Sequence, residues 1–382
     1  MSQNTQINKL ALNKDIQNIN LSSIGDNLLF YSYHISFLKK LIAQNKALDD
    51  PQYISSFSSF KGEIYENIIY ELLLRYALTN DEITSFILKG PHQNKNVKNG
   101  KIGLQIDKNA QIVYKSGYKD ISEFDGMFFS KDSVYFVEST IVNTTSNLRK
   151  RLRKKKAILE ILFPKLKIKA LIILTSGATG TNVFPDYCTV WVTKDFSAEE
   201  LLNKILSKEK GKFKRLKSDK FVEVSSLNYY HFKYFDTMKF LLKKSHDVET
   251  HRIDLKFLRT NKVRRYFDIF TKIYIGYIDE QNFRALVPNV EVEINDDIIY
   301  VTIEQKDNNK FAIVYYLRTL SKKLKRVEAL DNRVDISDKD PKGFTNSEIK
   351  FMSYIITPAY ALHKNSIKYI ENSVSKWKST DR

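Results

Sequence analysis

Apolar residues recur every three or four positions in several stretches of the chain, and this spacing predicts amphipathic helices. The clearest stretch is 60–78, FKGEIYENIIYELLLRYAL, where apolar side chains repeat at every fourth position from Ile64 to Tyr76. The tail from residue 347 is also expected to be helical. The helices predicted upstream of the tail are 27–46, 60–78, 147–163 and 196–208.

Alternating patterns and short continuous apolar runs predict the strands. Residues 103–117 alternate around the sequence DKNA and predict a hairpin. Residues 169–176 and 188–194 are short apolar runs of the kind that forms buried strands. The remaining predicted strands are 121–129, 134–142, 291–305 and 310–319.

The order of these elements predicts the fold class. Helices and a hairpin precede two strands, a helix, two more strands and a further helix, which is typical of an α/β fold with a mixed central sheet flanked by helices. We expect an N-terminal helical segment over residues 1–50, the α/β domain over 51–208 and a C-terminal α+β domain over 209–382. The Lys-rich stretch 207–220 marks the boundary between the last two.

Two acids interrupt the apolar runs of neighbouring predicted strands. In one strand Val134, Phe136 and Glu138 share a face, and both faces of this strand are mostly apolar. A carboxylate in such a strand is unfavourable unless it is paired, protonated or bound to a metal. Asp125 is in the same position on the preceding strand, and the short turn SKDS would bring the two acids side by side.

Two carboxylates on adjacent strands suit Mg²⁺ or Mn²⁺, which are hard ions that prefer oxygen ligands. The pair Asp125 and Glu138 therefore indicates a metal site. The alternative is that both acids sit at strand ends and are solvated.

The net charge of the chain favours a polyanionic partner. Its 382 residues include 62 Lys and Arg against 44 Asp and Glu, a formal net charge of +18. Neutralising phosphates and releasing counterions would give such a chain sequence-independent affinity for nucleic acid. The alternative is a protein that simply uses Lys at its surface.

Composition and the N-terminal sequence bear on the cellular compartment. The single cysteine, Cys188, excludes an internal disulfide and a zinc site built from cysteines. The N-terminal residues are polar and lack the apolar core of a signal peptide. No run approaches the ~20 apolar residues of a membrane span. We therefore expect a cytoplasmic protein with no membrane partner.

The arrangement of the acids resembles the PD-(D/E)XK nuclease superfamily over about residues 57–207. Members carry an Asp on one strand, E-x-K on the next and then a helix, and many add a Glu on an earlier helix within G-x-x-[FY]-E. The matching residues here are Asp125 in EFD, Glu138 in VEST and Glu66 in GEIYE. The resemblance implies a restriction-endonuclease-like fold that hydrolyses phosphodiester bonds, with Mg²⁺ or Mn²⁺ held by Glu66, Asp125, Glu138 and the carbonyl of Ser139.

The chain departs from the family at the lysine of E-x-K, where it has Thr140. The cap-snatching endonucleases of segmented negative-strand RNA viruses supply this lysine from the following helix instead. In the predicted helix 147–163, Lys155 falls in the middle of the leucine stripe at about 100° per residue, with Lys154 and Lys156 at its sides. Lys155 is therefore the candidate catalytic lysine. The alternative is that its ammonium reaches out to solvent.

Two other motifs match the required chemistry less well. A literal E-x-K occurs at Glu304-Gln305-Lys306, but its strand alternates as if half exposed, with Glu304 on the wetter face, and is followed by another strand rather than a helix. His34 lies in the first predicted helix, where some cap-snatching relatives bind metal. A lone histidine on an aromatic helix is more often structural, so we expect neither motif to form the site.

The expected function is that of a divalent-metal-dependent endonuclease with Asp125, Glu138 and Lys155 as catalytic residues, acting on nucleic acid, with DNA favoured over RNA. The alternative is a catalytically degenerate nuclease-fold protein that binds nucleic acid. Residues 228–244 interleave aromatic and basic side chains, which suits base stacking with phosphate contact as well as an ordinary core. The C-terminal domain is expected to bind nucleic acid, or to form a homodimer or contact a protein partner.

Overall fold

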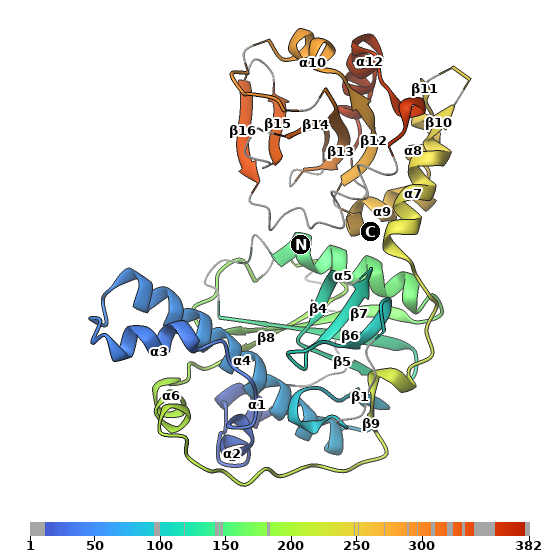
Figure 1. Ribbon diagram of the computed structural model, residues 1–382. Coiled ribbons are helices and arrows are strands. Elements are labelled where there is room, and N and C mark those ends of the chain that lie inside the picture. Colours follow the sequence, from blue (N-terminus) through green and yellow to red (C-terminus); the bar gives the residue numbers. More distant parts are fainter. Residues whose placement is uncertain are drawn as a thin grey trace, which may run out of the picture. The chain divides into compact units, whose positions relative to one another are not determined.

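The computed structural model describes the chain from Leu12 to Lys378 apart from several internal segments (Figure 1). The residues outside the description are 1–11, 95–99, 118, 142–144, 146–147, 182–183, 248, 251, 271, 289, 296, 307–309, 319–323, 331–332, 340–355 and 379–382, together with the side chains at 324, 329–330 and 333–339. The chain divides into two compact units. The first comprises Met1–Lys115, Asp120–Leu152 and Leu159–His231, and the second Ser116–Lys119, Arg153–Ile158 and Phe232–Arg382.

The longest helix of the first unit is α4 (Pro51–Thr79), which contains the predicted helix and starts earlier. Asp50 caps its N-terminus, because its carboxylate accepts the backbone N–H groups of Gln52 and Tyr53. Pro51 occupies the first helical position, where a missing N–H is tolerated. These capping residues explain why the helix begins nine residues before the predicted start at residue 60.

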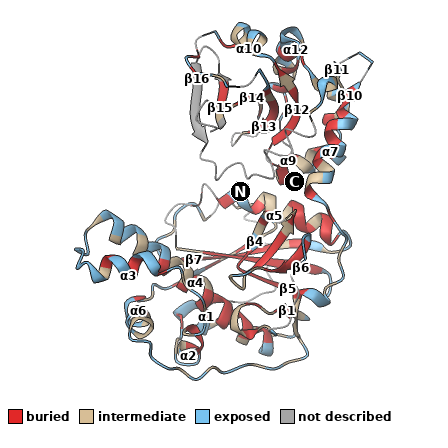
Figure 2. Ribbon diagram, viewed as in Figure 1, coloured by how far each residue is buried: buried red, intermediate tan, exposed pale blue. Residues whose placement is uncertain are grey.

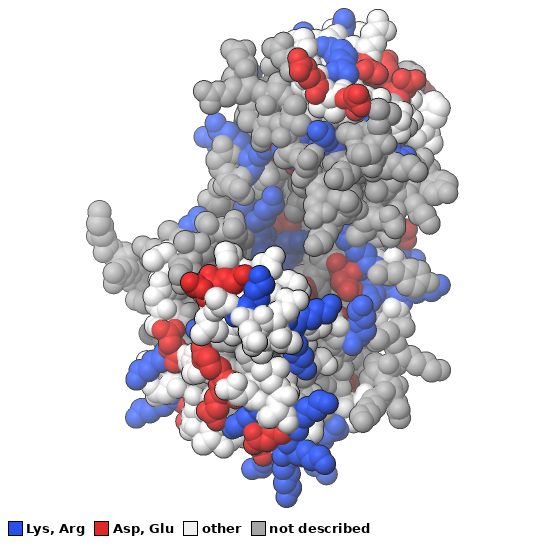
Figure 3. Space-filling view, turned by 60° about the vertical axis from the view of Figure 1, so that its left-hand side comes forward, with Lys and Arg blue, Asp and Glu red and all other residues white. Residues whose placement is uncertain are grey.

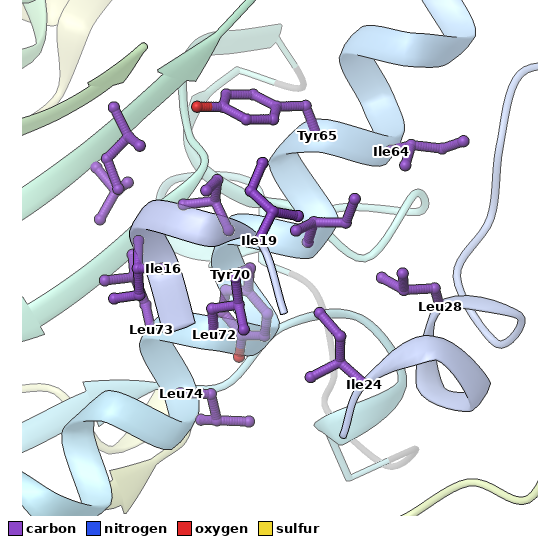
Figure 4. Close-up of a cluster of buried hydrophobic side chains, with 14 of the residues drawn as sticks. Ile16, Ile19, Ile24, Leu28, Ile64, Tyr65, Tyr70, Leu72, Leu73 and Leu74 are labelled. Atoms are coloured by element: carbon purple, nitrogen blue, oxygen red, sulfur yellow. The ribbon is translucent and has the colours of Figure 1, made fainter. Parts of the chain in front are cut away.

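Helix α4 forms the centre of the hydrophobic core of this unit. The short helices α1 (Lys14–Asn18) and α2 (Gly25–Leu28) bring Ile16 and Leu28 into the same core (Figure 4). The sheet contributes one of its faces to the core. The sheet residues in this cluster are Phe86, Phe128, Tyr135, Val137, Leu171, Ile173 and Trp191.

The prediction of one continuous helix over 27–46 is wrong. Helix α3 (Ser36–Ala43) is separate from α2, and His34 lies in the segment between them. The hydroxyl of Tyr33 folds back and donates to the carbonyl of Leu28 at 2.8 Å, so a side chain satisfies the end of α2. An apolar repeat cannot reveal this competition between a side chain and the helical backbone.

A buried polar network on α4 ties the N-terminal segment to the rest of the first unit. The carboxylate of Glu71, which is fully buried, accepts the hydroxyl of Tyr31 at 2.9 Å and the amide of Asn27 at 3.1 Å. Its oxygens also lie 2.6 Å from Nε2 of His92 and 2.5 Å from the guanidinium of Arg75. Four partners thus satisfy one buried charge.

A six-stranded mixed sheet crosses the first unit, and this confirms the predicted mixed central sheet flanked by helices. Its strands are β1 (Ser85–Ile87), β5 (Gly126–Phe129), β6 (Ser133–Thr140), β7 (Lys167–Thr175), β8 (Cys188–Thr193) and β9 (Phe221–Val222). The order is β8-β7-β6-β5-β1-β9, with β6 parallel to β7 and antiparallel to β5. Strand β6 is central, and every residue in it except Thr140 is buried (Figure 2).

The predicted strand 121–129 is in fact two strands that belong to different sheets. Strand β4 (Lys119–Phe124) lies in a three-stranded sheet with β2 (Gly103–Ile106) and β3 (Ile112–Ser116), whereas β5 lies in the six-stranded sheet. The chain bends at Asp125 between them. The antiparallel pairing of β2 with β3 confirms the predicted hairpin.

Two predicted helices of the α/β layer are confirmed with shorter bounds. Helix α5 (Leu148–Leu162) connects the parallel strands β6 and β7, and α6 (Glu199–Leu206) follows β8. Tyr135 and Val137 of β6 pack in the core around α4. Because side chains alternate along a strand, the even-numbered residues of β6 point to the opposite face of the sheet. Glu138 is on that opposite face.

The Lys-rich stretch predicted as a domain boundary belongs to the first unit. The backbone N–H of Lys212 donates to the carboxylate of Asp26 at 3.2 Å, and Lys214 both donates to and accepts from the side chain of Asn27. Strand β9 then adds to the edge of the six-stranded sheet. The division between the two units follows His231 instead.

The second unit is built on an antiparallel sheet of order β12-β13-β14-β15-β16. Its strands are β12 (Lys272–Ile278), β13 (Ile299–Gln305), β14 (Phe311–Arg318), β15 (Leu324–Leu330) and β16 (Arg333–Lys339). The pairing of β13 with β14 confirms the antiparallel strands predicted over 291–305 and 310–319, although β13 begins only at Ile299.

Helices and two short strands complete the second unit. They are α7 (Tyr234–Ser245), β10 (His246–Asp247), β11 (Arg252–Ile253), α8 (Leu255–Leu258), α9 (Asn261–Phe270), α10 (Glu280–Leu286) and α12 (Lys364–Val374). Helix α12 confirms part of the predicted helical tail, whose residues 347–355 lie outside the described chain. Among the helices described, none has the length and apolar character needed to span a bilayer.

Candidate active site

Asp125 and Glu138 lie on neighbouring segments of chain. The pairing of Gly126 with Val137 fixes the register of β5 and β6, so Asp125, directly before β5, lies beside the segment of β6 that carries Glu138 and Ser139. A Cβ at Gly126 would lie 3.2 Å from Cγ2 of Val137, so the glycine lets the two strands approach closely beside the acids. The structure thus brings these two predicted site residues together.

Ser139 holds the carboxylate of Asp125. Its backbone N–H donates to Oδ2 at 2.6 Å, and its hydroxyl donates to the same oxygen at 3.1 Å. Asp125 is only 8% exposed and Glu138 only 2%, so the alternative of two solvated acids at strand ends is wrong. The two hydrogen bonds satisfy one oxygen of Asp125 and fix the orientation of the carboxylate, and neither of them uses Oδ1.

Arg151 of α5 forms an ion pair with Glu138, through a guanidinium nitrogen that donates to Oε1. The side chain of Arg151 is 52% exposed, whereas that of Glu138 is 2% exposed. Arg151 was not among the predicted site residues. Its signal was its helical position, because Arg151 falls about 60° from Leu148 and one turn before Lys155, at the edge of the leucine stripe.

Helix α5 buries the face that carries its leucines. Leu148, Leu152, Leu159 and Leu162 are all buried. Lys155 is 5% exposed, whereas Lys154 and Lys156 are half-buried. The burial of Lys155 fits the stripe and excludes the alternative of a side chain that extends into solvent. Its catalytic role stays a prediction.

Glu66 is half-buried on α4. The neighbouring residue Tyr65 is fully buried, and the hydroxyl of Tyr65 lies 2.9 Å from the hydroxyl of Thr193 on β8. Within the described ranges, no group of three or more His, Cys, Asp and Glu side chains has an arrangement that could hold a metal ion. The described contacts join Asp125 to Ser139 and Glu138 to Arg151, and the roles of Asp125, Glu138 and Glu66 as ligands of one metal ion stay predictions.

A pair of buried carboxylates is a donor set that suits Mg²⁺, which keeps several waters and takes one or two carboxylates plus substrate phosphate oxygens. Mn²⁺ accepts the same oxygen ligands. The guanidinium of Arg151 already lies at Glu138, so a cationic group reaches this carboxylate. The residues present therefore fit a divalent ion held by two carboxylates.

The literal E-x-K motif lies in a buried ionic network of the second unit. Glu304 is 9% exposed and accepts from the hydroxyl of Tyr316 and, at 3.1 Å, from Arg326. Arg326 also lies 2.8 Å from Glu328, which pairs with Lys306. The prediction that Glu304 is on the wetter face is wrong, since both faces of β13 are covered. A strand does follow the motif, as expected.

The side chain of His34 is 71% exposed, and its Nδ1 lies 3.1 Å from the carboxylate of Glu63 on α4. The same carboxylate accepts the backbone N–H of His34 at 2.8 Å. His34 therefore fixes the chain between α2 and α3 onto α4, which agrees with the structural role expected for it.

The surface is basic without one unbroken patch in the view of Figure 3, where Lys and Arg side chains lie among Asp and Glu side chains. On α5, Arg149 and Lys150 are exposed next to the half-exposed Arg151.

Comparison of the chain with family models, with curated proteins and with solved structures found no match in any of the three.

Proposed function

We propose that the protein is a divalent-metal-dependent endonuclease that hydrolyses phosphodiester bonds of nucleic acid, with DNA favoured over RNA. The observation that supports this most is the burial of two acids, Asp125 and Glu138, on neighbouring segments at the end of the β5–β6 pairing. Fully buried acids are unusual, and acids placed in this way are typical of functional sites.

In this proposal the residues of the chain have separate tasks. Asp125 and Glu138 bind Mg²⁺ or Mn²⁺, and Ser139 keeps Asp125 oriented through the two hydrogen bonds that it donates. A bound divalent ion supplies an activated water and stabilises charge on the phosphate oxygens. Lys155 orients the attacking water or stabilises the negative charge that develops in the transition state. The exposed cation Lys150 of α5 binds the phosphate backbone.

The second candidate is a nucleic-acid-binding protein on a degenerate nuclease fold. Two observations favour it: Thr140 stands at the position of the family lysine, and Arg151 neutralises Glu138. Such a protein would bind nucleic acid with a steep salt dependence and cleave none.

Incubation with labelled nucleic acid distinguishes the two candidates. We expect the purified protein to cleave duplex DNA with Mg²⁺ or Mn²⁺ and to leave it intact with EDTA, with single-stranded DNA and RNA as the parallel substrates. Binding at low salt without cleavage of any substrate would favour the degenerate candidate. Cleavage that persists in EDTA would contradict a metal-dependent mechanism.

We expect Mn²⁺ to raise the melting temperature of the wild-type protein and not that of Glu138→Ala. A ligand that binds only the native state adds RT ln(1 + [L]/Kd), about 2.7 kcal/mol when the free ion is at 100 times its Kd. Scanning fluorimetry with MnCl₂ against EDTA measures the shift. Glu63→Ala, which removes an acid of α4 that pairs with the exposed His34, is the control and should shift as the wild type does. An equal shift in Glu138→Ala would place the ion elsewhere.

We expect Lys155→Ala to reduce the cleavage rate by ~10²-fold or more, the scale for losing one electrostatic or acid–base group. Lys154→Ala and Lys156→Ala are the controls, since both side chains lie on the same helix and are less buried. They should change mainly affinity and its salt dependence. Single-turnover cleavage at saturating protein separates the two effects. Normal cleavage by all three variants would show that α5 does not supply the catalytic lysine.

A further inference from the structure

The ion pair between Arg151 and Glu138 is asymmetric. Arg151 is half exposed, so its guanidinium can leave the pair and remain in water. Glu138 is 2% exposed and stays buried whatever Arg151 does, so a second cation that takes the place of the guanidinium would keep its charge compensated. The pair is therefore one in which the cation can be replaced and the carboxylate cannot.

The surroundings of Arg151 also favour its release. It lies in the first turns of α5 within the sequence RKRLRKKK, so Lys154 and Lys155 follow it at three and four positions in the helix. Like charges at this spacing repel each other. A phosphate diester next to this turn would attract the released guanidinium, whose planar donors match phosphate oxygens in pairs.

We propose that Arg151 is the exchangeable counter-ion of Glu138. A divalent ion displaces the guanidinium from the carboxylate, and the released guanidinium then binds a phosphate of the nucleic acid. The inference rests on the proposed function, because it concerns the same acid pair. It assigns to Arg151 a positioning and substrate-binding role that the resemblance to the nuclease superfamily does not imply.

This exchange has a thermodynamic consequence. Because the ion and Arg151 compete for Glu138, the guanidinium weakens binding of the ion when nucleic acid is absent. Nucleic acid that takes up the guanidinium removes this competition, and by reciprocity the bound ion strengthens binding of nucleic acid. The site would thus be loaded with metal most completely when substrate is present.

The first test measures Mn²⁺ binding without nucleic acid, by the electron paramagnetic resonance signal of the free ion. We expect Arg151→Gln to bind Mn²⁺ with a Kd about threefold to fivefold lower than that of the wild type, the scale of an ion pair with one exposed partner. Arg149→Gln removes the same charge from an exposed neighbour and should resemble the wild type. A Kd in Arg151→Gln that is unchanged or higher would overturn the inference, as would the absence of Mn²⁺ binding in every variant.

The second test measures affinity for a duplex in EDTA and in Ca²⁺, by fluorescence anisotropy at one ionic strength. We expect Ca²⁺ to strengthen binding by the wild type and by Arg149→Gln, and to strengthen it less in Arg151→Gln. An equal gain in Arg151→Gln would overturn the role in phosphate binding. Failure of the wild type to cleave any substrate would defeat the proposed endonuclease, whereas these two binding comparisons would still decide the role of Arg151.

Discussion

Asp125→Asn and Glu138→Gln are each expected to abolish cleavage of labelled DNA, with a loss of ~10³-fold or more. An amide keeps the shape of the carboxylate and removes the charge that holds the ion. A bound metal ion stabilises the transition state by several kcal/mol, and each loss of about 1.4 kcal/mol slows the reaction about tenfold. In Asp125→Asn the side-chain oxygen still accepts the hydrogen bonds of Ser139, so the fold should be retained. Circular dichroism and melting curves check the fold, and single-turnover cleavage measures the rate.

Asp132→Asn is the matched control for these two variants. Asp132 lies in the turn of the same hairpin, its side chain is 60% exposed, and it pairs with Lys167 at the surface. Its cleavage rate should equal that of the wild type. Full activity in folded Asp125→Asn or Glu138→Gln would end the proposal that this acid pair performs the chemistry.

Glu71→Gln is expected to destabilise the first unit by ~3 kcal/mol at pH 7, because it removes one partner of a buried ionic network and leaves the others unpaired. Glu71 is fully buried among Tyr31, Asn27, His92 and Arg75. The fluorescence of Trp191 in a Trp377→Phe background reports urea unfolding of this unit, since the chain has two tryptophans and Trp191 lies in the first unit.

The pH dependence of this effect has a definite sign. Burial by itself raises the pKa of Glu71, but the hydrogen bond and charge of His92, followed by those of Arg75, outweigh burial and hold the pKa below its ordinary value of 4.5. The stability that the ionised carboxylate contributes is therefore complete above about pH 4.5 and is lost as the pH falls through the native pKa. The difference in unfolding free energy between the wild type and Glu71→Gln should become smaller as the pH falls through that range.

Glu200→Gln is the control for Glu71→Gln. Glu200 is exposed on α6 and pairs with Lys204 one turn later, so its loss should leave the unfolding free energy unchanged. A difference in unfolding free energy between the wild type and Glu71→Gln that stays constant as the pH falls below 4.5 would show that folding does not lower the pKa of Glu71.

The parts of the fold that follow a simple period were predictable from the sequence. Helix α4 and strand β6 present long runs with one period each, and the leucine stripe of α5 correctly indicated which of three lysines is buried. Asp125 and Glu138 were identifiable because a carboxylate in an apolar strand is unusual. These signals are local, and the tertiary structure agrees with them.

The remaining features depend on contacts between distant segments. The run 121–129 is uniformly strand-like, so nothing in it shows that the chain changes sheets at Asp125. Glu304 was expected to be exposed because its strand alternates, but Arg326, which is 22 residues away, pairs with it in the folded protein. Arg151 was missed for the same reason, since its partner is on a different element. Periodicity describes one element at a time and carries no information about ion pairs between elements.

The hairpin β5–β6 places its turn and its acids at opposite ends. The turn at Lys131 and Asp132 is exposed, whereas Glu138 lies five residues beyond Ser133, a distance of about 17 Å along an extended strand. An insertion in this turn would leave the register of Gly126 and Val137 intact, because the pairing of β6 with β7 also fixes β6. Lys131 is therefore a suitable attachment point for a fluorophore or an affinity tag, one that labels the hairpin without moving the carboxylates.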